Sequence, residues 1–92
     1  MKDFLLFVLP DCPYCRRALR WQEEIFNAHP EYRDLPLQVV DESTENDVSQ
    51  TYDYYYVPCY FWGKEKLAEG VLSRHQIQET FQRVWDESQA NS

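Results

Sequence analysis

The sequence predicts a single α/β domain over residues 1–92, with a four-stranded mixed sheet and helices on both of its faces. Apolar runs typical of strands alternate with amphipathic helical patterns, in the order β-α-β-α-β-β-α. The last two strands are separated only by a short glycine-containing turn, which indicates an antiparallel hairpin. The length of 92 residues and the hydrophobic content of 43% suit one packed domain.

Residues Asp3–Leu9 are expected to form the first strand, because they contain a continuous apolar run. Strands covered by helices on both faces have such runs. A helix is expected from Pro13, since apolar residues then recur every three or four positions. It should end at His29, because the residue before a proline is pushed out of helical geometry. The predicted core-facing stripe comprises Tyr14, Ala18, Trp21, Ile25 and Ala28.

The next segments predict a parallel crossover followed by a short helix. Glu31–Leu35 is expected to be a polar connection, and Pro36–Asp41 a second strand parallel to the first. Glu42–Thr51 is expected to form the short helix, with Ser43 as its N-cap. Its first turn carries acidic residues, which favour the positive end of the helix dipole.

The second half of the chain predicts a hairpin and a final helix. Tyr54–Trp62 is dense in β-forming residues and should be the third strand, with Lys66–Ala68 pairing back as a short edge strand. Ser73 and Gln76 have the spacing of a capping box at the start of the last helix. Gln89–Ser92 is expected to be a frayed polar tail. The core face of the last helix should comprise Ile77, Phe81, Val84 and Trp85.

The overall charge excludes some classes of function. Nine basic and sixteen acidic residues leave a net charge of −7, which argues against nucleic-acid binding.

No apolar run approaches the roughly 20 residues that cross a bilayer. Met1 leads almost directly into the first strand, so we expect no signal peptide and a cytoplasmic location.

Arg16, Arg17 and Arg20 form the one basic cluster in the chain. They follow two closely spaced cysteines at the start of the first predicted helix. The cluster fits a solvated helix face. It also fits a local positive charge that lowers a thiol pKa and receives an anionic substrate.

Cys12-Pro13-Tyr14-Cys15 is the stretch that predicts chemistry. It lies at a strand-to-helix junction, and Pro13 suits the first helical position. Cys12 should therefore lie at the helix cap, where free N–H groups and the helix dipole favour a thiolate. Cys15 follows three residues later on the same helical face. The spacing predicts an attacking thiol at Cys12 and a resolving thiol at Cys15.

This motif resembles the active site of glutaredoxins, which are small members of the thioredoxin superfamily. Tyr56-Val57-Pro58 is similar to the Thr-Val-Pro segment that holds the cis-proline of that superfamily. The resemblance implies a thioredoxin fold, a cis peptide bond before Pro58, and substrate contacts at Pro13, Tyr14, Val57 and Pro58. Val57 would offer its N–H and C=O to an extended substrate. The residues alone also allow an ordinary trans proline at a strand start.

Three positions differ from the pattern that the resemblance implies for glutathione binding. Leu9 replaces a lysine, Glu69-Gly70 replaces a Gly-Gly pair, and Ser73 replaces an aspartate. Two charge-assisted contacts are missing as a result, each ordinarily worth about 1.5–3 kcal/mol. Glu69 also adds negative charge near an anionic tripeptide. We therefore expect weakened glutathione binding.

The function expected on these grounds is that of an enzyme, a glutaredoxin-like thiol–disulfide oxidoreductase. Its partners would be a disulfide-containing protein or a glutathione mixed disulfide, with no nucleic acid and no membrane. We expect no bound cofactor, and either glutathione or a flavoprotein reductase would supply electrons. An alternative is a peptide-binding or redox-sensing module with little turnover.

Two further interpretations concern the remaining residues. A zinc site would need two ligands besides the dithiol, and the candidates are Cys59, His29 and His75. Cys59 fits a buried small hydrophobic residue or a third redox thiol, and we expect it to have no catalytic role. An aromatic run predicts strand core or an apolar substrate groove; it comprises Tyr52, Tyr54, Tyr55, Tyr56, Tyr60, Phe61 and Trp62.

Overall fold

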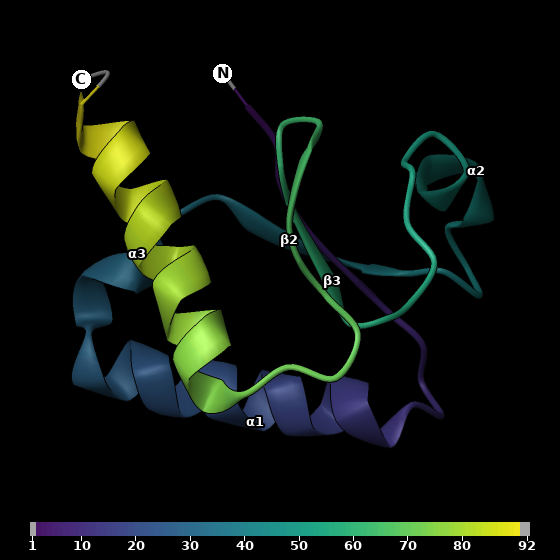
Figure 1. The fold of residues 1–92 in the computed structure, drawn as a ribbon, viewed down its shortest axis with the longest axis horizontal. Helices are drawn as coiled ribbons and strands as arrows, with labels where there is room; N and C mark the ends of the chain where they lie inside the picture. The colour runs from purple at the N-terminus through teal and green to yellow at the C-terminus, as the bar shows by residue number, and fades with distance from the viewer. Residues whose placement is uncertain (1, 91–92) are drawn as a thin grey trace.

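The computed structural model describes residues 2–90 (Figure 1). Helices and strands alternate along the first half of the chain, and a hairpin precedes the last helix. A short 3-10 helix, η1, follows the first α-helix. The elements are β1 Phe4–Val8, α1 Pro13–Ala28, η1 Pro30–Asp34, β2 Leu37–Asp41, α2 Asn46–Ser49, β3 Cys59–Trp62, β4 Glu65–Glu69 and α3 Arg74–Ala90.

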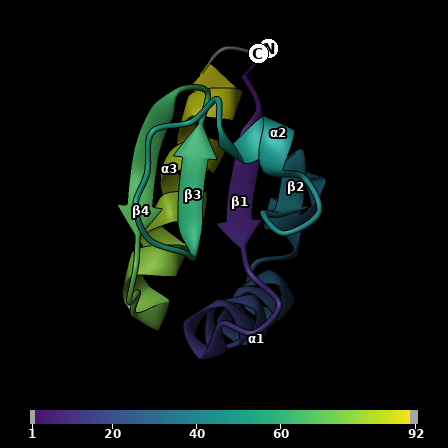
Figure 2. The ribbon, with the colours of Figure 1, turned by 90° about the vertical axis from the view of Figure 1, so that its right-hand side faces the viewer.

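The four strands form one mixed sheet in the order β2-β1-β3-β4. Figure 2 shows this order, with β1 and β3 in the centre. β1 pairs with β2 in parallel, whereas β3 is antiparallel to both β1 and β4. The predicted α/β class, the four-stranded mixed sheet and the parallel crossover are confirmed.

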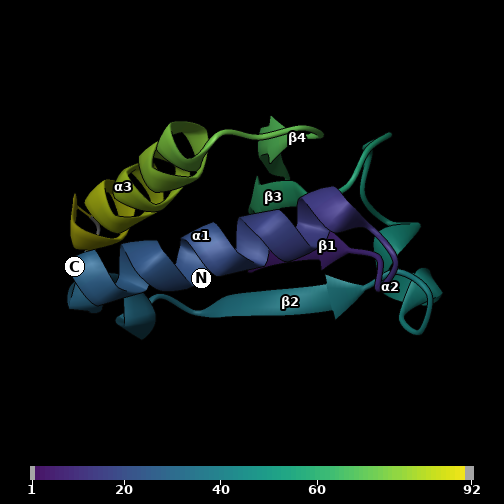
Figure 3. The same cartoon turned by 90° about the horizontal axis from the view of Figure 1, so that it is seen from below.

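Helices cover both faces of the sheet. α1 and α3 cross on one face of the sheet (Figures 1 and 3). On that face Phe4, Leu6 and Val8 belong to the main core. Leu5 and Phe7 point to the opposite face, where they pack against Val48 of α2 and the tyrosines that follow it. All five residues of β1 are buried, as its continuous apolar run predicts.

The buried stripe of α1 differs from the prediction. Cys15, Ala18, Gln22 and Ile25 are its buried residues, whereas Tyr14 is 45% exposed. Ala18 and Ile25 are buried as predicted, but Cys15 and Gln22 are buried in place of Tyr14 and Trp21, and Ala28 is exposed. Gln22 is tolerated inside because its side-chain oxygen accepts a hydrogen bond from the buried Tyr60 hydroxyl at 2.8 Å.

The third strand begins at Cys59, so the prediction of a strand from Tyr54 was wrong. β-propensity failed here because Tyr54 packs on the sheet from a loop, and the Tyr55 and Tyr56 N–H groups bond to the Glu69 carboxylate and not to a neighbouring strand. Tyr54 stacks on Phe7 with ring centroids 4.8 Å apart, and Tyr52 lies 5.2 Å from the same ring. Burial on the sheet face decides their conformation in place of strand pairing.

Two connections also differ from expectation. Residues 31–35 are not a simple polar link, because η1 occupies Pro30–Asp34 and buries Tyr32. α2 is confined to Asn46–Ser49, and Ser43 does not cap it. The Ser43 N–H instead donates to the Asp41 carboxylate at 2.9 Å, which forms an Asx-type turn before the helix.

The last helix starts as the sequence predicts. The Ser73 hydroxyl accepts a hydrogen bond from the Gln76 N–H at 3.1 Å, and the Gln76 side chain accepts one from the Ser73 N–H at 2.8 Å. The helix continues to Ala90, so Gln89 is helical and not part of a tail; residues 91–92 lie outside the described residues. Between residues 2 and 90, no helix is long and apolar enough to span a membrane.

Replacing Ser73 by alanine should lower the free energy of unfolding by about 1 kcal/mol, because it removes the reciprocal cap of α3. Urea denaturation followed by circular dichroism measures this loss. Ser43→Ala is the matched control and should cost less than about 0.5 kcal/mol, since Ser43 caps no helix. An equal or larger loss at Ser43 would contradict this capping assignment.

Candidate active site

Sheet register brings two distant segments together. Phe7 near the end of β1 pairs with Cys59 at the start of β3. Because the two strands are antiparallel, the loop that leaves β1 and the loop that enters β3 meet at one end of the sheet. The first loop carries Cys12 and the second carries Val57 and Pro58, so the two predicted motifs lie side by side.

Cys12 is the N-cap of α1. Its backbone is extended, with φ −89° and ψ 112°, and Pro13 occupies the first helical turn. The Cys12 N–H donates to the Leu9 carbonyl at 3.3 Å, which closes the turn that leaves β1. The Cys15 N–H donates to the Cys12 sulfur at 3.2 Å. The cap position predicted for Cys12 is confirmed, and a free helix N–H is directed at its sulfur.

The two thiols of the motif differ in environment. Cys12 is half-buried, whereas Cys15 is 1% exposed, and all three cysteines of the chain are free thiols. Burial raises the pKa of the Cys15 thiol to about 12, and a hydrogen bond with Cys12 adds to the shift. Cys12 is therefore the thiol that an external disulfide can reach, and Cys15 is held behind it in its protonated form.

Val57 and Pro58 are joined by a cis peptide bond. The cis geometry implied by the resemblance is confirmed, and an ordinary trans proline is excluded. The Val57 carbonyl accepts a hydrogen bond from the Cys12 thiol at 3.8 Å. Across the described part of the chain, the Val57 N–H donates to no protein acceptor. This N–H is thus available to a ligand that lies beside Cys12.

Glu69 at the end of β4 anchors the loop before Pro58. Its carboxylate accepts hydrogen bonds from the Tyr55 and Tyr56 N–H groups and lies 2.9 Å from the Lys66 ammonium. The hydrogen bond from Lys66 and the two backbone N–H bonds lower the pKa of Glu69 to about 2. From the sequence, Glu69 stands out only as a departure from the glutaredoxin pattern. No local signal indicates its hydrogen bonds with the Tyr55 and Tyr56 N–H groups, which lie fourteen and thirteen residues earlier in the chain.

Gly70 follows Glu69 with a φ of +86°, a conformation that L side chains rarely adopt. Its N–H donates to the Pro58 carbonyl at 2.9 Å. The end of β4 is therefore bonded to both sides of Val57, through Glu69 on one side and Gly70 on the other. These bonds position the Val57 backbone relative to the dithiol.

A groove of about 370 Å³ opens beside the dithiol. Its walls come from α1, the loop before Pro58 and the segment after β4. Tyr14, for which the resemblance implies a substrate contact, lines this groove and is 45% exposed; Val71, which no sequence pattern indicated, is 64% exposed. The lining residues are Tyr14, Tyr56, Val57, Glu69, Gly70 and Val71.

Of the seven aromatic residues predicted as core or groove, only Tyr56 lines this groove. Tyr60, Phe61 and Trp62 are buried in β3, and Tyr55 is exposed. Pro13, expected to contact substrate, is exposed at the helix start and does not line the groove.

Cys59 lies on the other face of the sheet from the dithiol. Its side chain is fully buried in the cluster of Phe7 and Phe61, whereas Cys15 belongs to the main core. Burial raises the pKa of the Cys59 thiol to about 12. Its predicted burial is confirmed, and its predicted lack of a catalytic role stays a prediction.

The candidate zinc ligands do not gather at the dithiol. His29 follows the last residue of the 16-residue α1, about 24 Å along the helix axis from its start, and stacks on Tyr32. His75 lies on α3 and faces Glu79 at 3.0 Å. Within residues 2–90, no group of three or more metal-ligating side chains comes together.

The three positions linked to glutathione have other surroundings here. Leu9 is an apolar side chain, 37% exposed, in the turn that precedes Cys12. Glu69 is engaged with the loop before Pro58, and the Ser73 hydroxyl caps α3. None of the three supplies a free charge of the kind expected for glutathione, and weakened glutathione binding stays a prediction.

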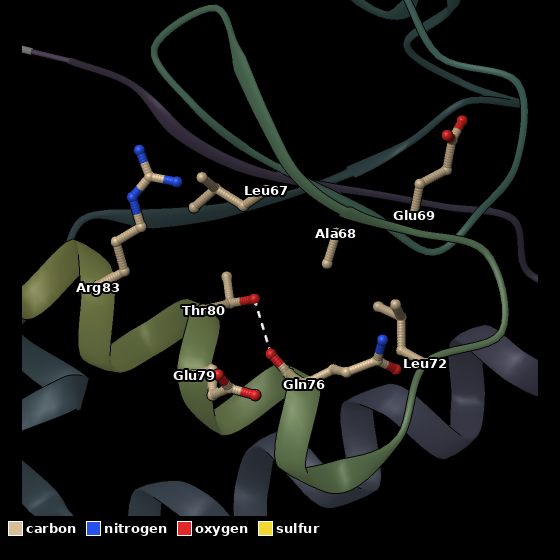
Figure 4. Close-up of a pocket in the computed structure, with 8 residues that line it drawn as sticks. All are labelled: Leu67, Ala68, Glu69, Leu72, Gln76, Glu79, Thr80 and Arg83. Carbon is tan, nitrogen blue, oxygen red and sulfur yellow. Dashed lines mark hydrogen bonds between the residues drawn. The ribbon is translucent and has the colours of Figure 1, made fainter.

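A second cavity, of about 360 Å³, lies between β4 and α3 (Figure 4). Its polar side chains bond within the protein: Thr80 donates to the Gln76 carbonyl at 2.9 Å, and Arg83 pairs with Glu65. No cysteine or histidine lines it. It therefore offers no thiol or imidazole for redox or acid–base chemistry.

No family model and no curated protein matches this chain. A solved structure described as "Structure of a malarial protein" superposes with a TM-score of 0.67 at 14% sequence identity. The superposition covers 90% of this chain and 96% of that one. The likeness is one of fold. It supports the α/β architecture and leaves the activity to be argued from the geometry of the site.

Iodoacetamide at neutral pH should alkylate Cys12 at least about tenfold faster than Cys15 or Cys59, because only Cys12 is accessible and the other two have raised pKa values. Peptide mass spectrometry over a time course measures the three rates. In urea the rates should converge, which is the internal control. Faster alkylation of either buried thiol in the native protein would contradict the site as described.

Glu69→Gln should remove a pH-dependent part of the stability. The folded pKa of about 2 lies below the ordinary value of 4.5, so Glu69 stabilises the fold above pH 4.5 and loses this effect as the pH falls toward 2. Urea midpoints from neutral pH to pH 2 should therefore fall less steeply in this variant than in the wild type. Asp34→Asn, at an exposed site, is the control and should retain the wild-type slope; identical slopes in all three proteins would refute the role of Glu69.

Proposed function

We propose that the chain is a glutaredoxin-like thiol–disulfide oxidoreductase with a thioredoxin fold. The observation that carries the proposal is the position of the Cys12 sulfur. It lies at the start of α1, 3.2 Å from the Cys15 N–H nitrogen and 3.8 Å from the Val57 carbonyl beside a cis-proline. This arrangement suits an accessible nucleophile with a resolving thiol behind it and a backbone edge for the substrate.

The positions of the dithiol and the cis-proline relative to the strands and helices support the proposed thioredoxin fold. The dithiol follows β1 at the start of α1, and the cis-proline directly precedes β3. The central β1–β3 pairing brings them together. The resemblance to glutaredoxins implies this same placement of the two motifs.

In the proposed reaction, the Cys12 thiolate attacks one sulfur of the substrate disulfide. A bond forms between Cys12 and that sulfur, and the second substrate sulfur leaves as a thiolate that takes up a proton. Cys15 then gives up its proton and attacks the Cys12 sulfur. The Cys12–Cys15 disulfide forms, the first substrate sulfur leaves and is protonated, and the substrate has gained two electrons and two protons.

The different environments of the two thiols suit this order of events. A substrate reaches the half-buried Cys12 before the buried Cys15. The raised pKa of Cys15 keeps it a thiol until Cys12 is engaged in the mixed disulfide. The Cys15 N–H bonded to the Cys12 sulfur also stabilises negative charge on that atom in the thiolate that attacks.

The electrons would come from glutathione or a flavoprotein reductase, which reduces the Cys12–Cys15 disulfide after each turnover. No bound cofactor is needed, since the dithiol itself carries the two electrons. Three cysteines, an odd number in a small chain, do not make a disulfide framework, so we propose the cytoplasm as the location.

A second candidate function is a peptide-binding or redox-sensing module with little turnover. The unpaired Val57 N–H and the apolar groove favour it, because both would serve binding without catalysis. The two candidate functions differ in catalytic turnover, because only the oxidoreductase would accelerate disulfide reduction.

Reduction of insulin by dithiothreitol, followed by turbidity, should be accelerated by the wild-type protein. Cys12→Ser should lower this acceleration by about 100-fold or more, because it removes the nucleophile. Cys15→Ser should instead accumulate a mixed disulfide between Cys12 and insulin, visible by non-reducing mass spectrometry.

Cys59→Ala is the matched control, since it removes a thiol on the other face of the sheet, and it should retain most of the activity. Circular dichroism confirms that each variant is folded. A folded Cys12→Ser protein with undiminished activity would refute the proposed function. Stoichiometric binding of the substrate without acceleration by the wild type would favour the binding module.

A further inference from the structure

The walls of the groove beside Cys12 are apolar where a substrate would lie. Tyr14, Tyr56 and Val71 expose ring and methyl surface from three different segments of the chain. When an apolar side chain of a ligand covers exposed apolar side chains in a concave surface, the burial makes the free energy of binding more favourable. The groove therefore favours a ligand with an apolar side chain close to its reactive sulfur.

Glu69, the one acidic residue that lines the groove, does not disfavour an apolar ligand. Glu69 is bonded to the Tyr55 and Tyr56 N–H groups and to Lys66, so its charge is neutralised by the protein itself. It has no need of a cation from the ligand. The part of the groove that Glu69 lines therefore favours neither a positively nor a negatively charged ligand.

The helix α1, which supplies Tyr14 to the groove, carries three cations without acidic partners within residues 2–90. Among the described residues, Arg33, Arg74 and Arg83 each pair with a glutamate at 2.5–3.5 Å, whereas Arg16, Arg17 and Arg20 pair with none. This contrast is notable in a chain with sixteen acidic residues and nine basic ones. The unpaired arginines all lie on the first turns of α1, beside the dithiol.

Arg17 places this charge at the groove itself. Its guanidinium lies 5.3 Å from the ring centroid of Tyr14, a lining residue, and 4.7 Å from that of Trp21. One nitrogen donates to the Leu72 carbonyl at 3.5 Å, next to the lining residue Val71. Its Nε is buried without a hydrogen-bond partner, and the terminal donors not bonded to Leu72 are the ones left for a carboxylate.

We propose that the preferred substrate is an extended segment of a disulfide-containing protein, with an apolar side chain next to the reactive cysteine and an acidic side chain nearby. The proposal rests on the proposed function and specifies its substrate. The apolar side chain lies against Tyr14, Tyr56 and Val71. The substrate backbone pairs with Val57, and the acidic side chain pairs with Arg17.

Glutathione fits this groove poorly on chemical grounds. The residues that flank its cysteine are a γ-linked glutamate and a glycine, neither of which has an apolar side chain. Its ammonium group finds no free carboxylate, because Glu69 is already engaged. Mixed disulfides of glutathione are therefore poorer substrates than the protein segment that we describe.

Short peptides with one central cysteine, each disulfide-bonded to free cysteine, test the proposal. The residues next to the cysteine are either leucine or serine, and the terminal residues are either glutamate or lysine. The four combinations give the Leu/Glu, Leu/Lys, Ser/Glu and Ser/Lys peptides, and the cysteine–glutathione disulfide is the fifth probe. Pre-reduced protein reacts with each probe for a single turnover, and acid quenching with mass spectrometry gives the rates.

The Leu/Glu peptide should react about tenfold faster than the Ser/Glu peptide, since burial of one leucine supplies that factor. It should also react about tenfold faster than the Leu/Lys peptide at low salt, with a smaller ratio at high salt. The glutathione probe should be at least about tenfold slower than the Leu/Glu peptide.

Variants assign each preference to its residue. Val71→Ser should diminish the leucine preference, and Arg17→Gln the glutamate preference. Lys64→Gln is the charge-matched control: it lies in the β3–β4 hairpin, at the opposite end of the sheet from Cys12, and should retain both preferences.

Four outcomes would overturn the proposal in whole or in part. Equal rates for the four peptides, or a glutathione probe as fast as the Leu/Glu peptide, would refute the substrate class while the reductase activity stands. Loss of the glutamate preference in Lys64→Gln and not in Arg17→Gln would refute the role of Arg17. If wild type reduces no probe faster than Cys12→Ser, both the proposed function and this inference fail.

Discussion

The antiparallel pairing of β1 with β3 is the constraint on which the site depends. Its register sets Phe7 opposite Cys59, so the end of one central strand and the start of the other lie together at one end of the sheet. Cys12 follows the first strand and Val57 precedes the second, which explains how residues 45 positions apart come to share a hydrogen bond. The two strands are buried on both faces, so a shift of register would expose apolar side chains to water. The geometry of the dithiol thus depends on the hydrophobic core.

Around that junction, the protein makes two chemically identical thiols different. Cys12 keeps access to solvent and receives a helix N–H, whereas burial raises the pKa of Cys15. We propose that this difference sets the order of the redox steps. The substrate side of the site depends on a separate set of bonds, those of Glu69 and Gly70, which hold the loop that carries Val57. These bonds come from the end of β4, whereas the dithiol lies at the start of α1, so substitutions at Glu69 can be separated experimentally from substitutions at Cys12 and Cys15.

Sequence patterns predicted the parts of this structure that depend on local chemistry. The apolar run of β1, the Cys12 cap and the Ser73 capping box were all confirmed, because each is decided by residues a few positions apart. The cis bond before Pro58 came from the resemblance alone, since local sequence favours trans. The tyrosine segment was predicted as strand because its propensity is high, yet packing of Tyr54 on Phe7 decides its conformation. The role of Glu69 and the groove depend on long-range contacts, which no periodicity reveals.

The most direct test of the account is the disulfide that the protein forms on mild oxidation. Reduced protein is equilibrated with oxidised dithiothreitol, quenched in acid, and digested for peptide mapping by mass spectrometry. Our account predicts one intramolecular disulfide between Cys12 and Cys15, with the Cys59 thiol unmodified, because the dithiol shares one helix turn and Cys59 faces the other side of the sheet. A disulfide that includes Cys59, or a Cys12 that forms only intermolecular disulfides, would contradict it.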